Sequence, residues 1–161
     1  MATKTLSMWN RLSGMPLGKR LFTAAVVARA PYFGTILPTV VEMAPGRCEV
    51  RAPKWFGVHN HISTFHAIAA CNLAEITMGM LAEATVPGTH RWIPKSMTVE
   101  YLAKAKTGLR GRAVLDELPE FGDEPFAMPV PVDILDRDDK VVVRAVISIW
   151  ITRSKNVGPP D

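Results

Sequence analysis

The stretch FHAIAACNLAEITMGMLAEA, residues 65–84, decides the fold of this chain. It contains no proline and one glycine, Gly79, so nothing in it interrupts a helix. Small or apolar residues surround most of the helical circumference, and such a helix must be buried on most of its sides. Ser63 and Thr64, just before the stretch, are both favoured N-cap residues. The sequence therefore predicts one long core helix that begins near residue 65.

Short β-rich runs lie on both sides of this helix. Two precede it and four follow it, over residues 37–43, 48–52, 91–103, 109–117, 126–136 and 140–153. The last run is largely apolar on both faces, as expected of a strand covered by a helix on one side and a partner on the other. A helix over residues 19–29 comes before all of these. We therefore expect an α+β fold, with an antiparallel sheet wrapped around a long central helix and an N-terminal leading helix.

The charge of the chain limits its partners. The formal net charge is +4, which suits an anionic partner such as a nucleic acid, a membrane surface or a small phosphorylated ligand. No block of lysine and arginine is long enough for a nucleic-acid tail, and the aromatic residues do not interleave with basic ones. No run approaches the roughly 18 apolar residues of a membrane span. We expect neither nucleic acid binding nor an integral membrane segment.

The cysteines indicate the compartment. Cys48 and Cys71 lack metal-ligand spacing and fall in an expected strand and an expected helix. This pattern favours reduced, packed thiols in a cytoplasmic protein. His59 and His61 have no third ligand at a recognisable spacing, so no metal site is expected.

Glu75 is the leading catalytic candidate. It lies among apolar residues of the helix expected to be buried, and a buried carboxylate is costly unless it is paired or used. Pairing with a cation, or a position in a wet seam of a subunit interface, are the alternatives. Asn72 lies one turn earlier and can share this side of the helix, although a helix-packing amide is its more common role.

A second group of polar residues gathers at the start of the helix: Asn60, His61, Ser63, Thr64 and His66. Free backbone N–H groups and the positive end of the helix dipole make a helix N-terminus suitable for an oxyanion or a phosphate. On the strand after the helix, Ser96 and Thr98 share one face and could hydrogen-bond a water.

Residues 60–79, NHISTFHAIAACNLAEITMG, resemble the helix motif of hotdog-fold thioesterases. Those proteins carry an Asn, a His-Gly or His-Ala pair six and seven residues later, and a carboxylate fifteen residues after the Asn. Asn60, His66, Ala67 and Glu75 keep that spacing. The motifs PYFGT, EMAPG, NLAE and VEYLAKAK extend the resemblance over residues 31–153. The chain is similar to the phenylacetyl-CoA and 4-hydroxybenzoyl-CoA thioesterase type and to an uncharacterised bacterial hotdog branch.

Two positions depart from the family pattern. His66 is followed by Ala67 and Ile68, where the family often has two glycines, and Ser63 replaces a glycine before the helix. Ala67 can still offer its N–H, but close approach of the backbone to a ligand is less free than with glycine.

The resemblance implies an acyl-CoA thioesterase and assigns roles to the motif. The Ala67 N–H would polarise the thioester carbonyl, Glu75 would activate water or attack directly, Asn60 would orient the water or the thioester, and His66 would support them. The expected substrate-binding residues are His61, Ser63, Thr64, Asn72, Ser96, Thr98, Lys104 and Lys106. Other basic residues near the expected groove are Arg91, Lys95, Arg110 and Arg112, and candidates for the acyl pocket are Met78, Met80, Leu81 and Trp92. Coenzyme A is part of the substrate, so no cofactor is expected.

The resemblance also implies a homodimer or a dimer of dimers, in which Glu75 of one chain faces the helix start of the other. We divide the chain into an N-terminal helical leader (1–30), a hotdog domain (31–155) and a flexible tail (156–161). A hotdog dehydratase or hydratase, and a non-catalytic acyl-CoA sensor, remain the alternative functions.

Overall fold

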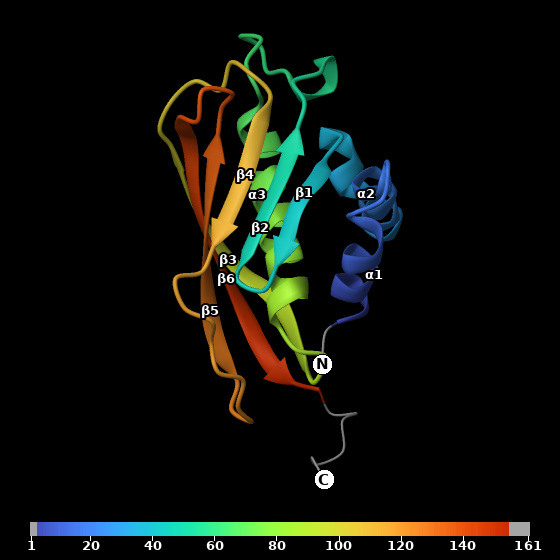
Figure 1. Cartoon of the computed structure of the whole chain (residues 1–161). Helices are drawn as coiled ribbons and strands as arrows, with labels where there is room; N and C mark the ends of the chain where they lie inside the picture. The colour runs from blue at the N-terminus through green and yellow to red at the C-terminus, as the bar shows by residue number, and fades with distance from the viewer. Residues whose placement is uncertain (1–2, 155–161) are drawn as a thin grey trace.

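Figure 1 shows the computed structural model of the chain, which describes residues 3–154; the expected tail at 156–161 lies outside them. The elements follow in the order α1 (Lys4–Leu12), α2 (Gly18–Arg29), η1 (Pro31–Ile36), β1 (Thr39–Ala44), β2 (Arg47–Ala52), η2 (Phe56–Val58), α3 (Ala67–Thr85), β3 (His90–Tyr101), β4 (Leu109–Val114), β5 (Phe126–Leu135) and β6 (Val141–Arg153). The expected strands and the helix over 19–29 are present with shifts of a few residues at their ends. The N-terminal region contains a second helix, α1, that the sequence analysis did not separate.

The six strands form one antiparallel sheet in the order β1-β2-β4-β5-β6-β3. α3 lies across one face of this sheet, as Figure 1 shows. Twelve of the 19 residues of α3 are buried, which confirms the prediction of a core helix. The molecule is an antiparallel sheet wrapped around a central helix, as expected from the sequence.

The close packing of α3 on the sheet depends on Gly111 in β4. A Cβ at this position would overlap the hydroxyl of Thr77 and lie 3.3 Å from the Thr77 Cβ and 3.4 Å from Ile134 Cδ1. Thr77 is fully buried and follows Glu75 by two residues, so this contact fixes the height of α3 above the sheet at the site considered below.

One edge of the sheet is covered by a helix, and the other edge is open. At β1, the Thr23 hydroxyl of α2 accepts the Val40 N–H at 3.0 Å, and Lys19 Nζ of α2 donates to the Val41 carbonyl at 2.7 Å. α2 therefore covers this edge. At the other edge, β3 pairs with β6 alone, and no other strand in residues 3–154 continues the sheet.

α3 is the one helix in the described part of the chain that is long and apolar enough to cross a membrane by length and composition. However, 67% of its most apolar window is buried inside the protein. This burial is that of a core helix.

Candidate functional site

Glu75 lies at the wall of an open cavity of about 690 Å³ that is lined by residues of α1, α2, η1, α3 and β3. Most of the side chains that surround it are apolar, and among them are Ala25, Tyr32, Met78, Gly79 and Trp92. The cavity falls in the size range of about 300–1,000 Å³ that is typical of small-molecule sites. A carboxylate therefore stands beside a largely apolar space of ligand size.

The expectation that Glu75 is buried is wrong for the single chain, where its side chain is exposed. The reason is an outward-facing stripe on the first half of α3, formed by Ile68, Cys71 and Glu75 at helical spacing. Ile68 is 56% exposed although it is apolar. Within residues 3–154 Glu75 has neither an ion pair nor a side-chain hydrogen bond, so its carboxylate is available to a ligand or a second chain.

The start of α3 differs from the prediction. Neither Ser63 nor Thr64 is the N-cap; the helix begins at Ala67, and the Nδ1 of His66 accepts the Ile68 N–H at 3.1 Å. His66 is therefore a capping residue with an exposed ring. The Ala67 N–H, at the first helical position, has no intrahelical acceptor and none elsewhere in residues 3–154. It is a free donor at the positive end of the α3 dipole.

Asn60 organises the loop that leads into this helix. Its Oδ1 accepts the N–H groups of Ile62 and Thr64 at 3.1 and 3.0 Å, and its Nδ2 donates to the Thr64 hydroxyl at 2.8 Å. These bonds explain why Ser63 and Thr64 do not cap the helix: Ser63 has a positive φ of 57°, and Thr64 is tied to Asn60. Ser63 thus adopts the backbone conformation that glycine favours, at the position where the family has glycine. Asn60 thus positions the loop, and its expected role of orienting the water or the thioester stays a prediction.

Asn72 proves to be a packing residue. It is 5% exposed, and its Nδ2 donates to the Thr35 hydroxyl at 3.2 Å and to the Tyr32 carbonyl at 3.4 Å. The contact ties η1 to α3. Tyr32 also contributes to the wall of the cavity beside Glu75, so the substrate-binding role of Asn72 stays a prediction.

Ser96 and Thr98 lie on the wrong face of the sheet to assist Glu75 of their own chain. They pair in register with Ser148 and Val146, whereas the alternating residues Met97 and Val99 pack against the core under α3. Their side chains therefore lie on the outer face. The prediction that they hold a water beside Glu75 is wrong for this reason.

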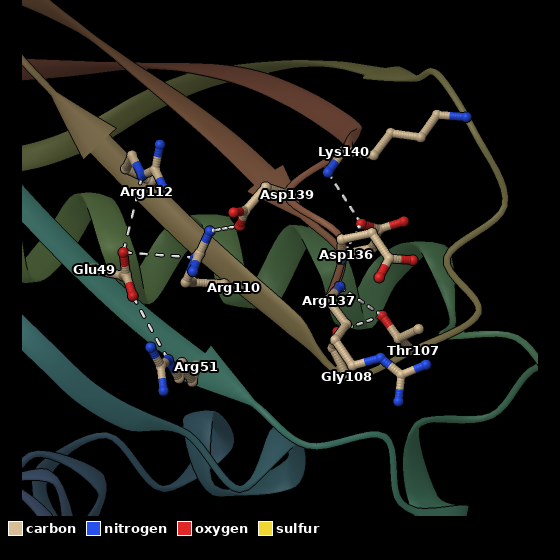
Figure 2. Close-up of polar contacts among 11 residues, drawn as sticks. Glu49, Arg51, Thr107, Gly108, Arg110, Arg112, Asp136, Arg137, Asp139 and Lys140 are labelled. Atoms are coloured by element: carbon tan, nitrogen blue, oxygen red, sulfur yellow. Dashed lines mark hydrogen bonds and ion pairs between the residues drawn. The ribbon is translucent and has the colours of Figure 1, made fainter.

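Lys104 and Lys106 are exposed on the loop that follows β3. Between them, the Ala105 carbonyl accepts the Phe65 N–H at 2.8 Å, which places the loop beside the approach to α3. The loop is anchored again where the Thr107 hydroxyl accepts the Arg137 N–H at 3.1 Å (Figure 2). Two lysines thus stand near the start of α3. His61, also expected to contact substrate, is exposed on the 60–64 loop.

Arg110 and Arg112 have partners elsewhere. Figure 2 shows both around Glu49 on the outer face of the sheet, where their Nε atoms lie 3.6 and 3.9 Å from Glu49 Oε2. Arg110 also pairs with Asp139. Their expected place at the substrate groove is therefore not supported.

Sequence reasoning missed two contacts around the site. Trp92 Nε1 donates to Glu83 Oε1 at 3.3 Å at one end of the cavity, and the Cys71 thiol lies 3.3 Å from the Tyr101 hydroxyl beside Glu75 on the exposed stripe. This hydrogen bond, together with partial burial, raises the pKa of Tyr101. Neither pair has a recognisable spacing, because each joins α3 to β3 across the fold. In residues 3–154 no three His, Cys, Asp or Glu side chains gather as a possible metal site.

A family model described as "Domain of unknown function (DUF4442)" matches residues 18–151. The chain belongs to the DUF4442 family. The matched region begins at the first residue of α2 and ends in β6, so the DUF4442 domain includes α2 and residues of all six strands. No curated protein sequence matches the chain.

Solved structures share the fold of this DUF4442 protein. The crystal structure of "genomics APC5556" is 40% identical with a TM-score of 0.80, covering 93% of this chain and 98% of that one. A Pseudomonas aeruginosa protein described as a protein of unknown function and probable thioesterase is 22% identical (TM-score 0.76; 87% and 99% covered). A Haemophilus influenzae thioesterase is 10% identical (TM-score 0.66; 78% and 87% covered). The expected hotdog fold is confirmed.

Proposed function

We propose that the protein is an acyl-CoA thioesterase, which hydrolyses the thioester of an acyl-CoA to a free acid and coenzyme A. The observation that carries this proposal is the Glu75 carboxylate, exposed and unpaired among the described residues, at the wall of a mostly apolar cavity of about 690 Å³. An apolar acyl group can occupy such a cavity while its carbonyl stays beside the carboxylate. The thioesterase names of the structural relatives point in the same direction.

The reaction needs a donor for the carbonyl oxygen and an acceptor or nucleophile for the carbonyl carbon. The Ala67 N–H supplies the donor, aided by the α3 dipole. Glu75 either removes a proton from the attacking water or attacks the carbonyl carbon itself, after which water cleaves the resulting anhydride. On both routes water adds across the bond between the acyl carbon and sulfur: oxygen joins the carbon, and coenzyme A leaves as the thiol.

One chain cannot bring these two groups together. Ala67 and Glu75 are eight residues apart on α3, which separates them by about 12 Å along the axis. A thioester carbonyl must lie within about 3 Å of each, or be reached through one water. We therefore place Glu75 of one subunit beside the Ala67 N–H of another.

The open edge of β3 provides the surface for that second subunit. β3 is 12 residues long, and an exposed strand edge of this length readily pairs with another chain. Ile93 and Tyr101 on β3 are 55% and 54% exposed, and Ile68 on α3 is 56% exposed. Pairing of two β3 strands would join the sheets, and the exposed stripes of α3 would gain a partner. The proposed assembly is a homodimer, or a dimer of such dimers.

Coenzyme A itself would be held mainly by charge. Lys104 and Lys106 stand near the start of α3 and are free to meet its phosphates, whereas Arg110 and Arg112 pair with Glu49. The free thiols of Cys48 and Cys71 fit a reducing, cytoplasmic location. Apart from coenzyme A, which is part of the substrate, the proposed reaction uses no cofactor.

The test is release of free thiol from acyl-CoAs of different length by the purified protein and two variants. Glu75→Gln removes the carboxylate at constant size, and Ala67→Pro removes the N–H at the first helical position, where proline is favoured. His66 has φ −64° and ψ 137°, a conformation that a following proline accepts. We expect losses of about 10²–10⁴-fold for Glu75→Gln and about 10²–10³-fold for Ala67→Pro.

Glu117→Gln, an exposed carboxylate in the loop after β4, is the matched control and should keep full activity. Circular dichroism and sedimentation confirm the fold and the assembly of each variant. Absence of thiol release from every acyl-CoA, with acyl-CoA still bound, would refute the enzyme and favour an acyl-CoA sensor. Full activity in Glu75→Gln would remove Glu75 from the mechanism.

A further inference from the structure

The cavity beside Glu75 extends along α3 in one direction. Glu75, Gly79 and Glu83 all contribute to its wall and follow one another at intervals of four residues, on one side of the helix. The eight residues from Glu75 to Glu83 span about 12 Å. Gly79 stands halfway, where the absence of a side chain leaves room between α3 and the Trp92 ring: a Cβ there would lie 3.5 Å from it.

Polar contacts lie at the far end of the cavity. Trp92 Nε1 donates to the Glu83 carboxylate at 3.3 Å, and the Thr3 hydroxyl donates to the Glu83 carbonyl at 2.6 Å. An apolar chain that starts at Glu75 therefore meets a polar stop near Glu83. The contact with Thr3 also fixes the start of α1 over this end.

The side of the cavity opposite the sheet is built by the N-terminal helices. Thr5 and Met8 of α1 and Ala25, Val26 and Arg29 of α2 contribute to its wall. Ala25 is half-buried, whereas its neighbour Ala24 is exposed to solvent. α1 and α2 thus form one wall of an open channel along α3, in addition to the cover that α2 gives the β1 edge.

We propose that the layer formed by α1 and α2 walls an acyl pocket that accepts an apolar acyl chain of about six to ten carbons. The length follows from the 12 Å between Glu75 and Glu83, because an extended chain with C–C bonds of about 1.5 Å advances about 1.25 Å per carbon. Gly79 and Ala25 set the width of the pocket. This inference deepens the proposed thioesterase function, since it names the class of acyl group that Glu75 serves.

The test compares the binding of octyl-CoA, a thioether that cannot be hydrolysed, with that of coenzyme A by isothermal titration calorimetry. We call the ratio of the affinity for octyl-CoA to that for coenzyme A the octyl increment. Each buried methylene strengthens binding about fourfold, so even three buried methylenes give an octyl increment of about sixty-fold in the wild type. Ala25→Phe should fill the channel and reduce the increment to about fivefold or less. Ala24→Phe, one residue away on the exposed side of α2, is the matched control and should keep it.

A second pair of variants tests the channel from the α3 side. Gly79→Val should also remove the increment, whereas Gly88→Val, whose Cβ meets no atom within 4 Å, should not. This pair decides the question if circular dichroism shows that Ala25→Phe does not fold.

The same variants are assayed for hydrolysis of acetyl-CoA and octanoyl-CoA. A protein that hydrolyses neither, yet loses the octyl increment in Ala25→Phe, would refute the thioesterase and support the pocket. A protein that hydrolyses both, with an unchanged preference and octyl increment in Ala25→Phe and Gly79→Val, would overturn the pocket and leave the thioesterase in place.

Discussion

The contact between α3 and the sheet predicts a strong coupling between Gly111 and Thr77. Gly111→Ala would place a Cβ onto the Thr77 hydroxyl and 3.3 Å from its Cβ, in a region that is fully buried. Overpacking of this kind costs about 1–3 kcal/mol of the free energy of unfolding. Thr77→Ala alone removes the 2.7 Å hydrogen bond from Thr77 Oγ1 to the Leu73 carbonyl, which contributes about 1 kcal/mol.

In the double variant the added methyl occupies the space that the hydroxyl left. The overlap with the hydroxyl disappears, and the loss from Thr77→Ala is the main cost that remains, so the double variant should be destabilised by about 1 kcal/mol. Simple addition of the two single effects would instead give about 2–4 kcal/mol. The predicted coupling is therefore about 1–3 kcal/mol in favour of the double variant.

Urea denaturation followed by circular dichroism measures all four proteins at one protein concentration, because the stability of an oligomer depends on concentration. Additivity of the two single effects within about 0.5 kcal/mol would refute the reasoning. It would mean that removal of the Thr77 hydroxyl does not relieve the overpacking by the added methyl, and that the position of Glu75 is not fixed by this contact.

Two further predictions concern the edge of the sheet and the buried thiol. Thr23→Val keeps the shape of the side chain but leaves the buried Val40 N–H without its acceptor. Urea denaturation should show that the free energy of unfolding falls by about 1–3 kcal/mol. A decrease below about 0.5 kcal/mol would mean that α2 does not satisfy the β1 edge. Burial, reinforced by the nearby carboxylates of Glu42 and Glu49, raises the pKa of Cys48 far above its ordinary value of 9.0. The contribution of this thiol to stability is therefore complete below pH 9. Above pH 9 it decreases by up to about 1.4 kcal/mol per pH unit. Cys48→Ala should flatten this alkaline decrease. A thiol reagent at neutral pH should leave Cys48 unmodified, and rapid modification of Cys48 would contradict its burial.

Most of the fold follows from local patterns. The long apolar helix and the six β-rich runs are visible in the sequence, and their predicted positions agree with α3 and β1 to β6 within a few residues. The start of α3 was predicted incorrectly, because Ser63 and Thr64 are favoured caps in isolation but are held in the loop by Asn60. The hydrogen bonds between Asn60 and Thr64 outweigh the intrinsic preference of serine and threonine for the N-cap position.

The candidate site was predictable only in part. The spacing of Asn60, His66, Ala67 and Glu75 indicates the family motif, but it does not show that Glu75 is exposed in one chain. The misplacement of Ser96 and Thr98 has a plain cause: alternation along a strand shows which residues share a face, but not which face meets α3. The cavity itself depends on α1 and α2, which are far from Glu75 in sequence, so no local pattern could reveal it.

The most direct test of the central claim is a complementation assay with Glu75→Gln and Ala67→Pro subunits. If each site combines Glu75 of one subunit with the Ala67 N–H of the other, each homodimer is inactive and a mixed dimer contains one intact site. After complete subunit exchange at equal concentrations, half of the dimers are mixed, so thiol release from acyl-CoA should recover to about a quarter of the wild-type rate. No recovery, in a mixture whose subunit exchange is confirmed by mass spectrometry, would contradict a site shared between two subunits.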